Sequence, residues 1–238
     1  MLPDFTQFAA TLEGFAPLLL RGVWVTVQLA LLSLLLGLAF GLLGACAKLS
    51  RVMAWRFCGQ LYTTLIRGVP DLLLMLLMFY GVQTGLSRLT QRVGWAYIDI
   101  DPFSAGVLTL GFIYGAYFTE TFRGALLAVP RGQLQAGKAL GMTATQSFAY
   151  VVFPQMMRLA LPGLGNNWMV LLKATALVSI IGLADLVKVA QVAGKSSGQM
   201  LSFLLLAALI YLVLSSASNA GLRALARRYG PPVQEASR

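Results

Sequence analysis

Long runs of apolar residues, separated by short polar segments, dominate the chain. The clearest run covers residues 22–47, which carry no charged side chain and are rich in leucine. A helix rises about 1.5 Å per residue and needs on the order of 20 apolar residues to cross the hydrocarbon of a bilayer. Four more runs reach this length, over residues 57–87, 102–127, 159–184 and 196–222. The pattern predicts an all-α, polytopic membrane protein with about five transmembrane helices, forming a single domain over residues 1–238.

Composition supports this class and excludes several others. The 238 residues are 58% hydrophobic and only 11% charged, whereas a soluble domain carries charge on about 25% of its residues. The chain has no histidine, which excludes imidazole general bases and most zinc sites. Its two cysteines, Cys46 and Cys58, do not make a disulfide framework. We therefore expect no catalytic residues, no metal site and no separate catalytic domain.

The net charge of +10 is explained by topology, because the basic residues are too scattered for a nucleic-acid surface. Cytoplasmic loops of membrane proteins keep an excess of Lys and Arg. One side of the predicted spans collects Lys48, Arg51, Arg56, Arg131, Lys138, Arg158, Arg223, Arg227, Arg228 and Arg238 against Glu235 alone. The other side collects Arg21, Arg88, Arg92, Lys188 and Lys195, balanced by Asp4, Glu13, Asp99, Asp101 and Asp185. The first side is predicted to be cytosolic, so five crossings place the N-terminus outside and the C-terminus inside.

Two acidic residues lie within the predicted spans, where a charge costs roughly 2.5 to 3.5 kcal/mol. Asp71 and Glu120 could each neutralise the cationic side chain of an amino acid inside a narrow cavity. The alternative is local pairing, because Arg67 lies four residues before Asp71 and Arg123 lies three after Glu120. Both interpretations stay open. A third basic residue in the spans, Lys173, is predicted to pair between helices.

Aromatic and hydroxyl side chains near these acids are candidates for the same site. Tyr117 lies one turn before Glu120, Tyr114 and Thr121 are close by, and Tyr80 follows Asp71 on the same run. Such groups suit a long cationic side chain, although membrane helices also use them for ordinary packing.

Glycine pairs spaced four residues apart occur in two of the predicted spans. Gly37 with Gly41, and Gly111 with Gly115, allow close approach of helices. We interpret them as packing positions.

The segment 129–154 is too polar to cross a membrane, yet it has an intermittent apolar face. We expect one or two short helices on the cytosolic side. It contains Gln135, Ala136 and Gly137, then Gly141 after three residues, Val151 after nine more, and Phe153 followed by Pro154. These intervals resemble the EAA signature of permease subunits in ATP-binding-cassette importers. Here Gln135 replaces the glutamate of that pattern, Gly137 an alanine, and Val151 and Phe153 its isoleucine and leucine. The alternative is a basic helix that only anchors the chain to anionic lipid.

Three further segments, residues 64–71, 115–124 and 161–168, resemble the polar amino acid permease family. The likeness is greatest to the Q-type subunits of histidine, lysine, arginine and ornithine importers. It implies a type I importer permease fold in a bacterial inner membrane, and transport of basic amino acids by alternating access. For such a substrate the candidate binding residues are Asp71, Glu120, Tyr117, Tyr80, Tyr114 and Thr121. The resemblance also implies that Gln135, Ala136, Gly137, Gly141 and Pro154 couple the chain to an ATPase.

The same resemblance implies partners. These are a second permease, favoured to be a homologous and different chain, two ATPase subunits that hold ATP and Mg, and a periplasmic amino acid-binding protein. This chain would bind no cofactor, since the sequence Gly194-Lys195-Ser196 lacks the first glycine of a phosphate loop. Two rival functions remain: a carrier driven by an ion gradient, and a structural membrane subunit.

Overall fold

The computed structural model describes residues 5–96 and 98–229, and every regular element in these ranges is a helix. The all-α prediction is thus confirmed. The helices are α1 (Phe5–Leu49), α2 (Met53–Gly68), α3 (Asp71–Val93), α4 (Pro102–Ala128), α5 (Arg131–Ala139), α6 (Ala144–Ser147), η1 (Phe148–Val152), α7 (Phe153–Ala174), η2 (Thr175–Ile181), α8 (Leu186–Ser197) and α9 (Met200–Tyr229). The charged residues Asp4, Glu235 and Arg238, used above for orientation, lie outside the described residues.

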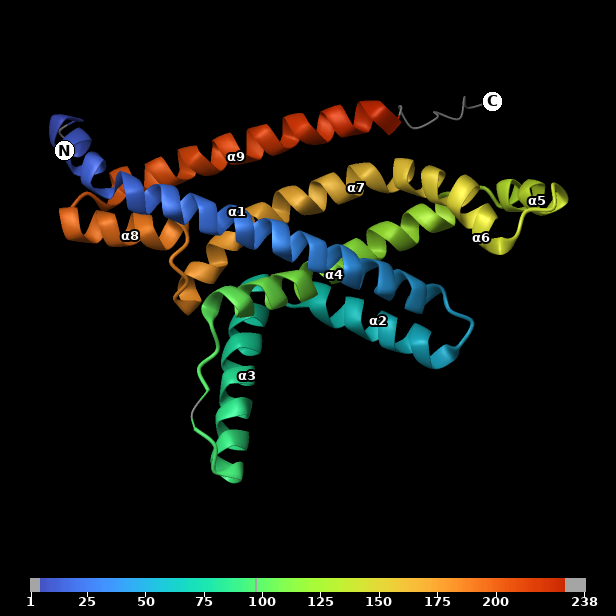
Figure 1. The fold of residues 1–238 in the computed structure, drawn as a ribbon, viewed down its shortest axis with the longest axis horizontal. Helices are drawn as coiled ribbons and strands as arrows, with labels where there is room; N and C mark the ends of the chain where they lie inside the picture. Colours follow the sequence, from blue (N-terminus) through green and yellow to red (C-terminus); the bar gives the residue numbers. More distant parts are fainter. Residues whose placement is uncertain (1–4, 97, 230–238) are drawn as a thin grey trace.

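The centre of the molecule is the contact between α1 and α4 (Figure 1). Both predicted glycine pairs lie in this contact and face large side chains of the opposite helix. A Cβ added at Gly41 would lie 2.5 Å from Cβ of Phe118, and one added at Gly115 would lie 2.6 Å from Cβ of Phe40. The two backbones can therefore approach this closely only because these side chains are absent.

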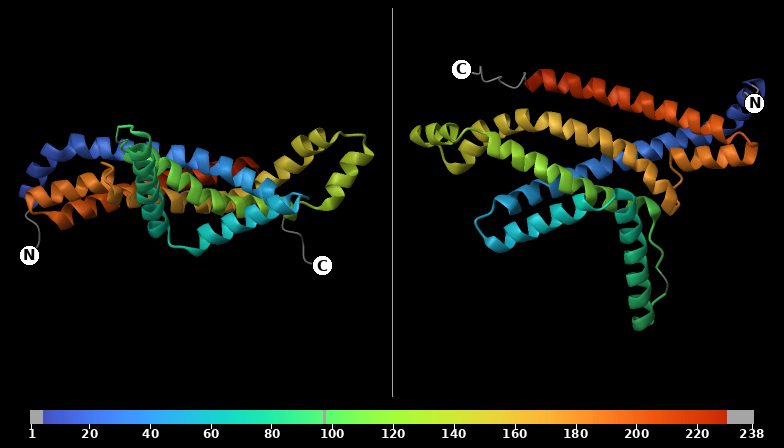
Figure 2. Two further views of the ribbon diagram at one scale, coloured as in Figure 1. Left: turned by 90° about the horizontal axis from the view of Figure 1, so that it is seen from below. Right: turned by 180° about the vertical axis from the view of Figure 1, so that it is seen from behind.

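The run predicted as one span over residues 57–87 is divided into two helices. α2 ends at Gly68, Val69 is extended with φ −115° and ψ 141°, and Pro70 precedes α3. Proline disfavours helical backbone at the residue before it and supplies no amide hydrogen, which explains the break. α3 then projects steeply away from the other helices (Figure 1 and the right view of Figure 2).

Four helical segments of the described chain are long and apolar enough to cross a membrane: Phe8–Leu49, Asp71–Val93, Ala144–Ile181 and Met200–Arg227. The span predicted over residues 102–127 is present as α4, which falls outside this set. Its glycines, tyrosines, threonines and the Glu120–Arg123 pair lower its hydropathy. Since α4 packs against α1, α2, α3 and α7, most of its surface contacts protein, and it does not need a continuous apolar face.

A second apolar cluster forms at the N-terminal end of α1. α1 begins well before the predicted span 22–47, and its 45 residues extend about 67 Å, more than a hydrocarbon core of about 30 Å. Its early part packs with α8 and α9, where the rings of Phe8 and Phe15 contact Phe203. The polar segment between the predicted spans 159–184 and 196–222 therefore contains a helix with buried residues.

Asp185 caps this helix from a buried position. One of its carboxylate oxygens accepts a hydrogen bond from the Lys188 amide at 2.9 Å, and the other has no hydrogen-bond partner among the described residues. Residue Asp185 is fully buried. Burial raises its pKa from the ordinary 3.8 to about 6, against the opposing effect of the amide hydrogen bonds.

Substitution of Gly41 by alanine should destabilise the protein, because the new methyl group would collide with Phe118. Overpacking of this kind costs about 1–3 kcal/mol, so we expect a lower thermal midpoint in detergent. Gly81→Ala in α3 is the matched control, since nothing lies within 4 Å of a Cβ added there. Equal midpoints for the two variants would show that the α1–α4 contact is not tight.

Asp185→Asn should stabilise the protein at pH 7.5 and lose this advantage as the pH falls below about 4. The pKa of Asp185 is raised on folding, so ionisation above pH 6 opposes the folded state by up to about 3 kcal/mol. Asparagine keeps the capping oxygen without the charge. Thermal melts of both proteins from pH 4 to 8 measure this difference, and a gap that is independent of pH would contradict it.

Candidate functional site

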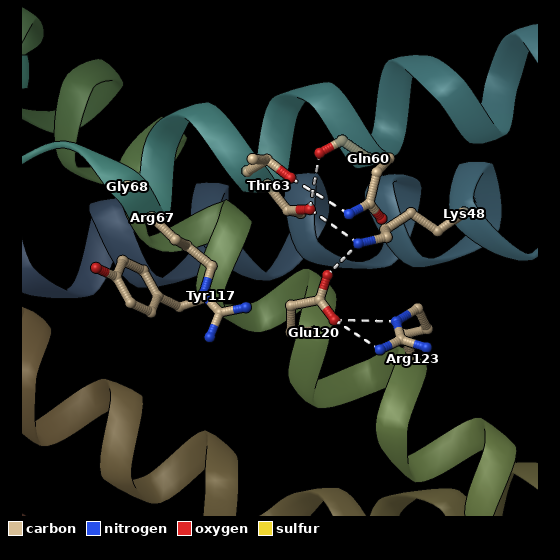
Figure 3. Close-up of a pocket in the computed structure, with 9 residues that line it drawn as sticks. Lys48, Gln60, Thr63, Arg67, Gly68, Tyr117, Glu120 and Arg123 are labelled. Carbon is tan, nitrogen blue, oxygen red and sulfur yellow. Dashed lines mark hydrogen bonds and ion pairs between the residues drawn. The ribbon is translucent and has the colours of Figure 1, made fainter.

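A cavity of about 430 Å³ lies between α1, α2 and α4. Its lining residues are Lys48, Gln60, Thr63, Thr64, Arg67, Gly68, Tyr117, Glu120 and Arg123 (Figure 3). Polar and charged side chains thus surround a space between helices that the sequence predicts to span a membrane. Such groups are costly there unless they pair with one another or face water or a polar substrate.

Glu120 is held by two basic side chains. Lys48 Nζ, from the end of α1, bonds to Oε1, and Arg123 binds Oε2 through Nε and Nη2, both at 2.9 Å (Figure 3). Lys48 also donates a hydrogen bond to the Thr63 hydroxyl on α2 at 2.8 Å. Glu120 therefore joins α4 to α1 through Lys48, and Lys48 in turn joins both to α2 through Thr63. The predicted local pair between Glu120 and Arg123 is present, and the structure adds Lys48 to it.

Asp71 has a different environment. Its carboxylate accepts a hydrogen bond from the hydroxyl of Tyr114 at 3.0 Å, and no described basic group forms an ion pair with it. Arg67, its expected partner, lies instead over the ring of Tyr117, 5.5 Å from the ring centroid. Tyr117 in turn stacks on Tyr114. The order of contacts runs from the cavity through Arg67 and Tyr117 to Tyr114 and Asp71.

Of the six predicted substrate-binding residues, Tyr117 and Glu120 line the cavity, and Tyr114 and Asp71 adjoin it through Tyr117. Thr121 is on another face of α4, where its hydroxyl accepts a hydrogen bond from Asn167 of α7 at 3.0 Å. Tyr80 is exposed on α3 and contacts Phe79, about 13 Å along the helix from Asp71. The structure therefore brings four of the six together.

Lys48 and Thr63 were not predicted as site residues. The sequence suggested that Lys48 is an ordinary cytosolic charge, yet its side chain is only 8% exposed. The signal that identifies it is the glycine stripe of α1: positions 37, 41, 44 and 48 share one face of a helix. A Cβ at Gly44 would lie 2.2 Å from the Thr119 hydroxyl, so the next turn places Lys48 against Glu120.

The segment with the EAA-like spacing forms α5, α6 and η1, which protrude beyond α4 and α7 at one end of the molecule (Figure 2). Gln135, Ala136 and Gly137 lie in α5, and Pro154 is in the first turn of α7. Gly137 is buried, and an added Cβ would lie 3.1 Å from the Ser147 hydroxyl. Gly141 has a φ of +76°, which a residue with a side chain rarely adopts. The glycines therefore set the turn between α5 and α6.

Comparison with known proteins agrees with this architecture. Residues 17–231 match the family described as "Binding-protein-dependent transport system inner membrane component". The chain belongs to this family. It is thus a multi-pass membrane protein, and its fold is that of an importer permease.

Two relatives and one solved structure from the comparison show which members of this family the chain is similar to. The histidine/lysine/arginine/ornithine transport system permease protein HisQ of Salmonella typhimurium (strain LT2) is 55% identical over 225 residues, covering 94% of this chain and 99% of HisQ. The arginine ABC transporter permease protein ArtQ of Haemophilus influenzae is 38% identical, covering 91% and 96%. A chain in the crystal structure of an amino acid ABC transporter with histidines has a TM-score of 0.80 and 32% identity, covering 96% of this chain and all of that one.

Exposed apolar residues distinguish the protruding segment of this permease from an ordinary surface loop. Leu140, at the end of α5, is 78% exposed, and Leu134 and Phe148 are also exposed. Arg131 and Lys138 on the same short helix are exposed and basic. A contiguous mixture of apolar and basic groups is typical of an interaction surface.

Proposed function

We propose that this chain is the permease subunit of an ATP-binding-cassette importer that passes basic amino acids into the cytoplasm by alternating access. The observation that carries the proposal is the environment of Asp71, a carboxylate beside a polar intramembrane cavity with a tyrosine hydroxyl as its partner and no cation paired with it in the described chain. A cationic side chain would complete this site. The names of HisQ and ArtQ point to the same substrate class.

The positive groups of the cavity also fit such a substrate. Lys48 and Arg123 are engaged by Glu120, while Arg67 is exposed and rests over the Tyr117 ring. A basic amino acid carries a carboxylate as well as a cationic side chain. Its carboxylate would bind Arg67, its stem would lie along Tyr117, and its side-chain cation would reach Asp71. Arginine fits a carboxylate particularly well because it can donate two parallel hydrogen bonds.

Partner subunits follow from the surfaces that the single chain leaves open. The exposed face of α5 would receive an ATPase subunit, and nucleotide hydrolysis, with its ATP and Mg, would take place in two such subunits. α3 projects from the bundle with only Met75 and Thr90 buried, and Lys173 is exposed on α7 without a described ion-pair partner. Both features fit contact with a second, homologous permease. A periplasmic amino acid-binding protein would approach the opposite end, near residues 88–101 and α8.

The proposed orientation places the N-terminus in the periplasm and the C-terminus in the cytoplasm. α5, with Arg131 and Lys138, is then cytosolic, as the excess of basic residues on that side predicts. α4 runs inward, so Glu120 lies closer to the cytoplasm than Asp71.

Asp71→Asn should weaken uptake of lysine and arginine, because the neutral amide cannot compensate a cation. A hydrogen bond to a charged group contributes about 1.5–3 kcal/mol, which corresponds to a rise in KM of roughly tenfold to a hundredfold. Radiolabelled uptake at several concentrations in cells that make the whole transporter measures this effect. Asp99→Asn, on the exposed segment before α4, is the control. Unchanged kinetics for Asp71→Asn would remove this residue from the site.

Leu140→Asp should reduce recovery of the ATPase subunit with the purified permease and reduce ATP-driven uptake to a similar extent. Leu140 is 78% exposed, so the substitution leaves the permease fold intact and places a charge on the proposed contact. Val52→Asp introduces the same charge at an exposed site in the turn between α1 and α2, and should have little effect. A Leu140→Asp complex with its full complement of ATPase would contradict the coupling role of α5.

A further inference from the structure

Glu120 is the second of two acids arranged in series along the proposed path. Tyr114, which bonds to Asp71, and Glu120 lie on the same helix, about 9 Å apart along its axis. Tyr117 and Arg67 occupy the space between them. A substrate that leaves Asp71 towards the cytoplasm therefore meets Glu120 next.

Lys48 already occupies the position that such a substrate would take. Its ammonium group bonds to Oε1 of Glu120 and to the Thr63 hydroxyl, and these two acceptors would serve two of the three N–H donors of a lysine substrate's side-chain ammonium. The Lys48 side chain is 8% exposed and belongs to the cavity wall. Because Lys48 is part of α1, its ammonium group is always available close to Glu120 (Figure 3).

Arg123 provides a useful contrast because it binds the other oxygen of the same carboxylate. Both of its contacts go to Oε2 from the same helix, so it neutralises Glu120 and orients it without occupying Oε1. If Lys48 left, Glu120 would keep one cation, and a carboxylate oxygen and a hydroxyl would become available together. An exchange of the Lys48 ammonium for the side-chain ammonium of the substrate keeps a cation on each carboxylate oxygen of Glu120, which avoids the cost of leaving Oε1 without a partner.

We propose that Lys48 is a tethered competitor for the substrate: it holds Glu120 when the inner part of the path is empty, and the cationic group of the substrate displaces it during passage. This inference rests on the proposed function and adds a specificity-determining residue to it. Only a substrate with a cationic side chain can restore the second ion pair of Glu120, on Oε1, that Lys48 gives up. Neutral amino acids are thereby rejected at a second point, after Asp71.

The test measures lysine binding to the assembled transporter, purified with its partner subunits, by isothermal titration. A competitor lowers apparent affinity by the fraction of time that it holds the site, so Lys48→Met should tighten lysine binding by roughly threefold to tenfold. Glutamine, which is neutral, should gain nothing. A purely structural role for Lys48 predicts weaker binding or none, so an increase in affinity distinguishes the two roles.

Four controls belong to the same experiment. Lys48→Arg keeps a competing cation and should bind lysine like the parent, and Arg123→Met should bring no gain because Lys48 still holds Oε1. Arg56→Met removes an exposed charge of α2 and should have no effect. In the double variant Lys48→Met/Glu120→Gln the gain should disappear, because the vacated acceptor is gone.

Two results separate this inference from the proposed function. Lysine binding that depends on Asp71 but does not tighten in Lys48→Met overturns the competitor and leaves the importer intact. A parent complex that binds no lysine, or binds it equally well as Asp71→Asn, overturns the substrate assignment itself. Should Lys48→Met fail to assemble, Lys48→Gln removes the competing cation and keeps a polar side chain beside Thr63, and the same gain in lysine affinity is expected; no gain there also overturns the competitor.

Discussion

The close contact between α1 and α4 is the constraint on which the rest of the structure depends. Three glycines of α1 remove the side chains that would separate it from Phe118 and Thr119, and two glycines of α4 do the same in return. The two axes are thereby held in one register, and the side chain one turn beyond Gly44 must lie beside Glu120. The packing of uncharged residues thus determines which basic side chain reaches the cavity, because it places Lys48 beside Glu120.

The basic groups within reach of each carboxylate explain why the two acids differ. Glu120 lies between helices that both carry basic groups within reach, and it satisfies each carboxylate oxygen with one of them. Asp71 begins α3 after the break at Pro70, and its nearest polar group is the Tyr114 hydroxyl. Because Pro70 turns the chain, Arg67 and Asp71 no longer share one helical face, and the ion pair that their spacing favours does not form. The same break leaves Arg67 free to lie over Tyr117.

The sequence was sufficient for the class of protein, the order of the main helices and the protruding segment, because apolar run length and glycine spacing are local properties. It also identified both acids, since an ionisable residue in an apolar run is conspicuous. It failed where the outcome depends on contacts between distant segments. Lys48 was assigned to a loop because it ends an apolar run, and its partner lies 72 positions away. Thr121 seemed to belong to the site by proximity in sequence, whereas its hydroxyl faces α7. α8 was missed because its polar composition resembles a loop, although Thr26 and Asp185 anchor its first turn.

α4 links the protruding segment to the Lys48–Glu120 contact, because α5 follows it in the chain and Glu120 belongs to it. α5 follows α4 directly through Val129 and Pro130, and η1, a stretch of wider π-type turns, connects the same segment to α7. A force applied to α5 would therefore reach α4 through Val129 and Pro130 and α7 through η1, whereas α1 ends at Leu49 and does not adjoin this segment along the chain. The Lys48–Glu120 contact joins α1 to α4, so any tilt of α4 relative to α1 changes the distance between ammonium and carboxylate. Separation of Lys48 from Glu120 and loosening of the inner end of the cavity are, on this geometry, the same movement.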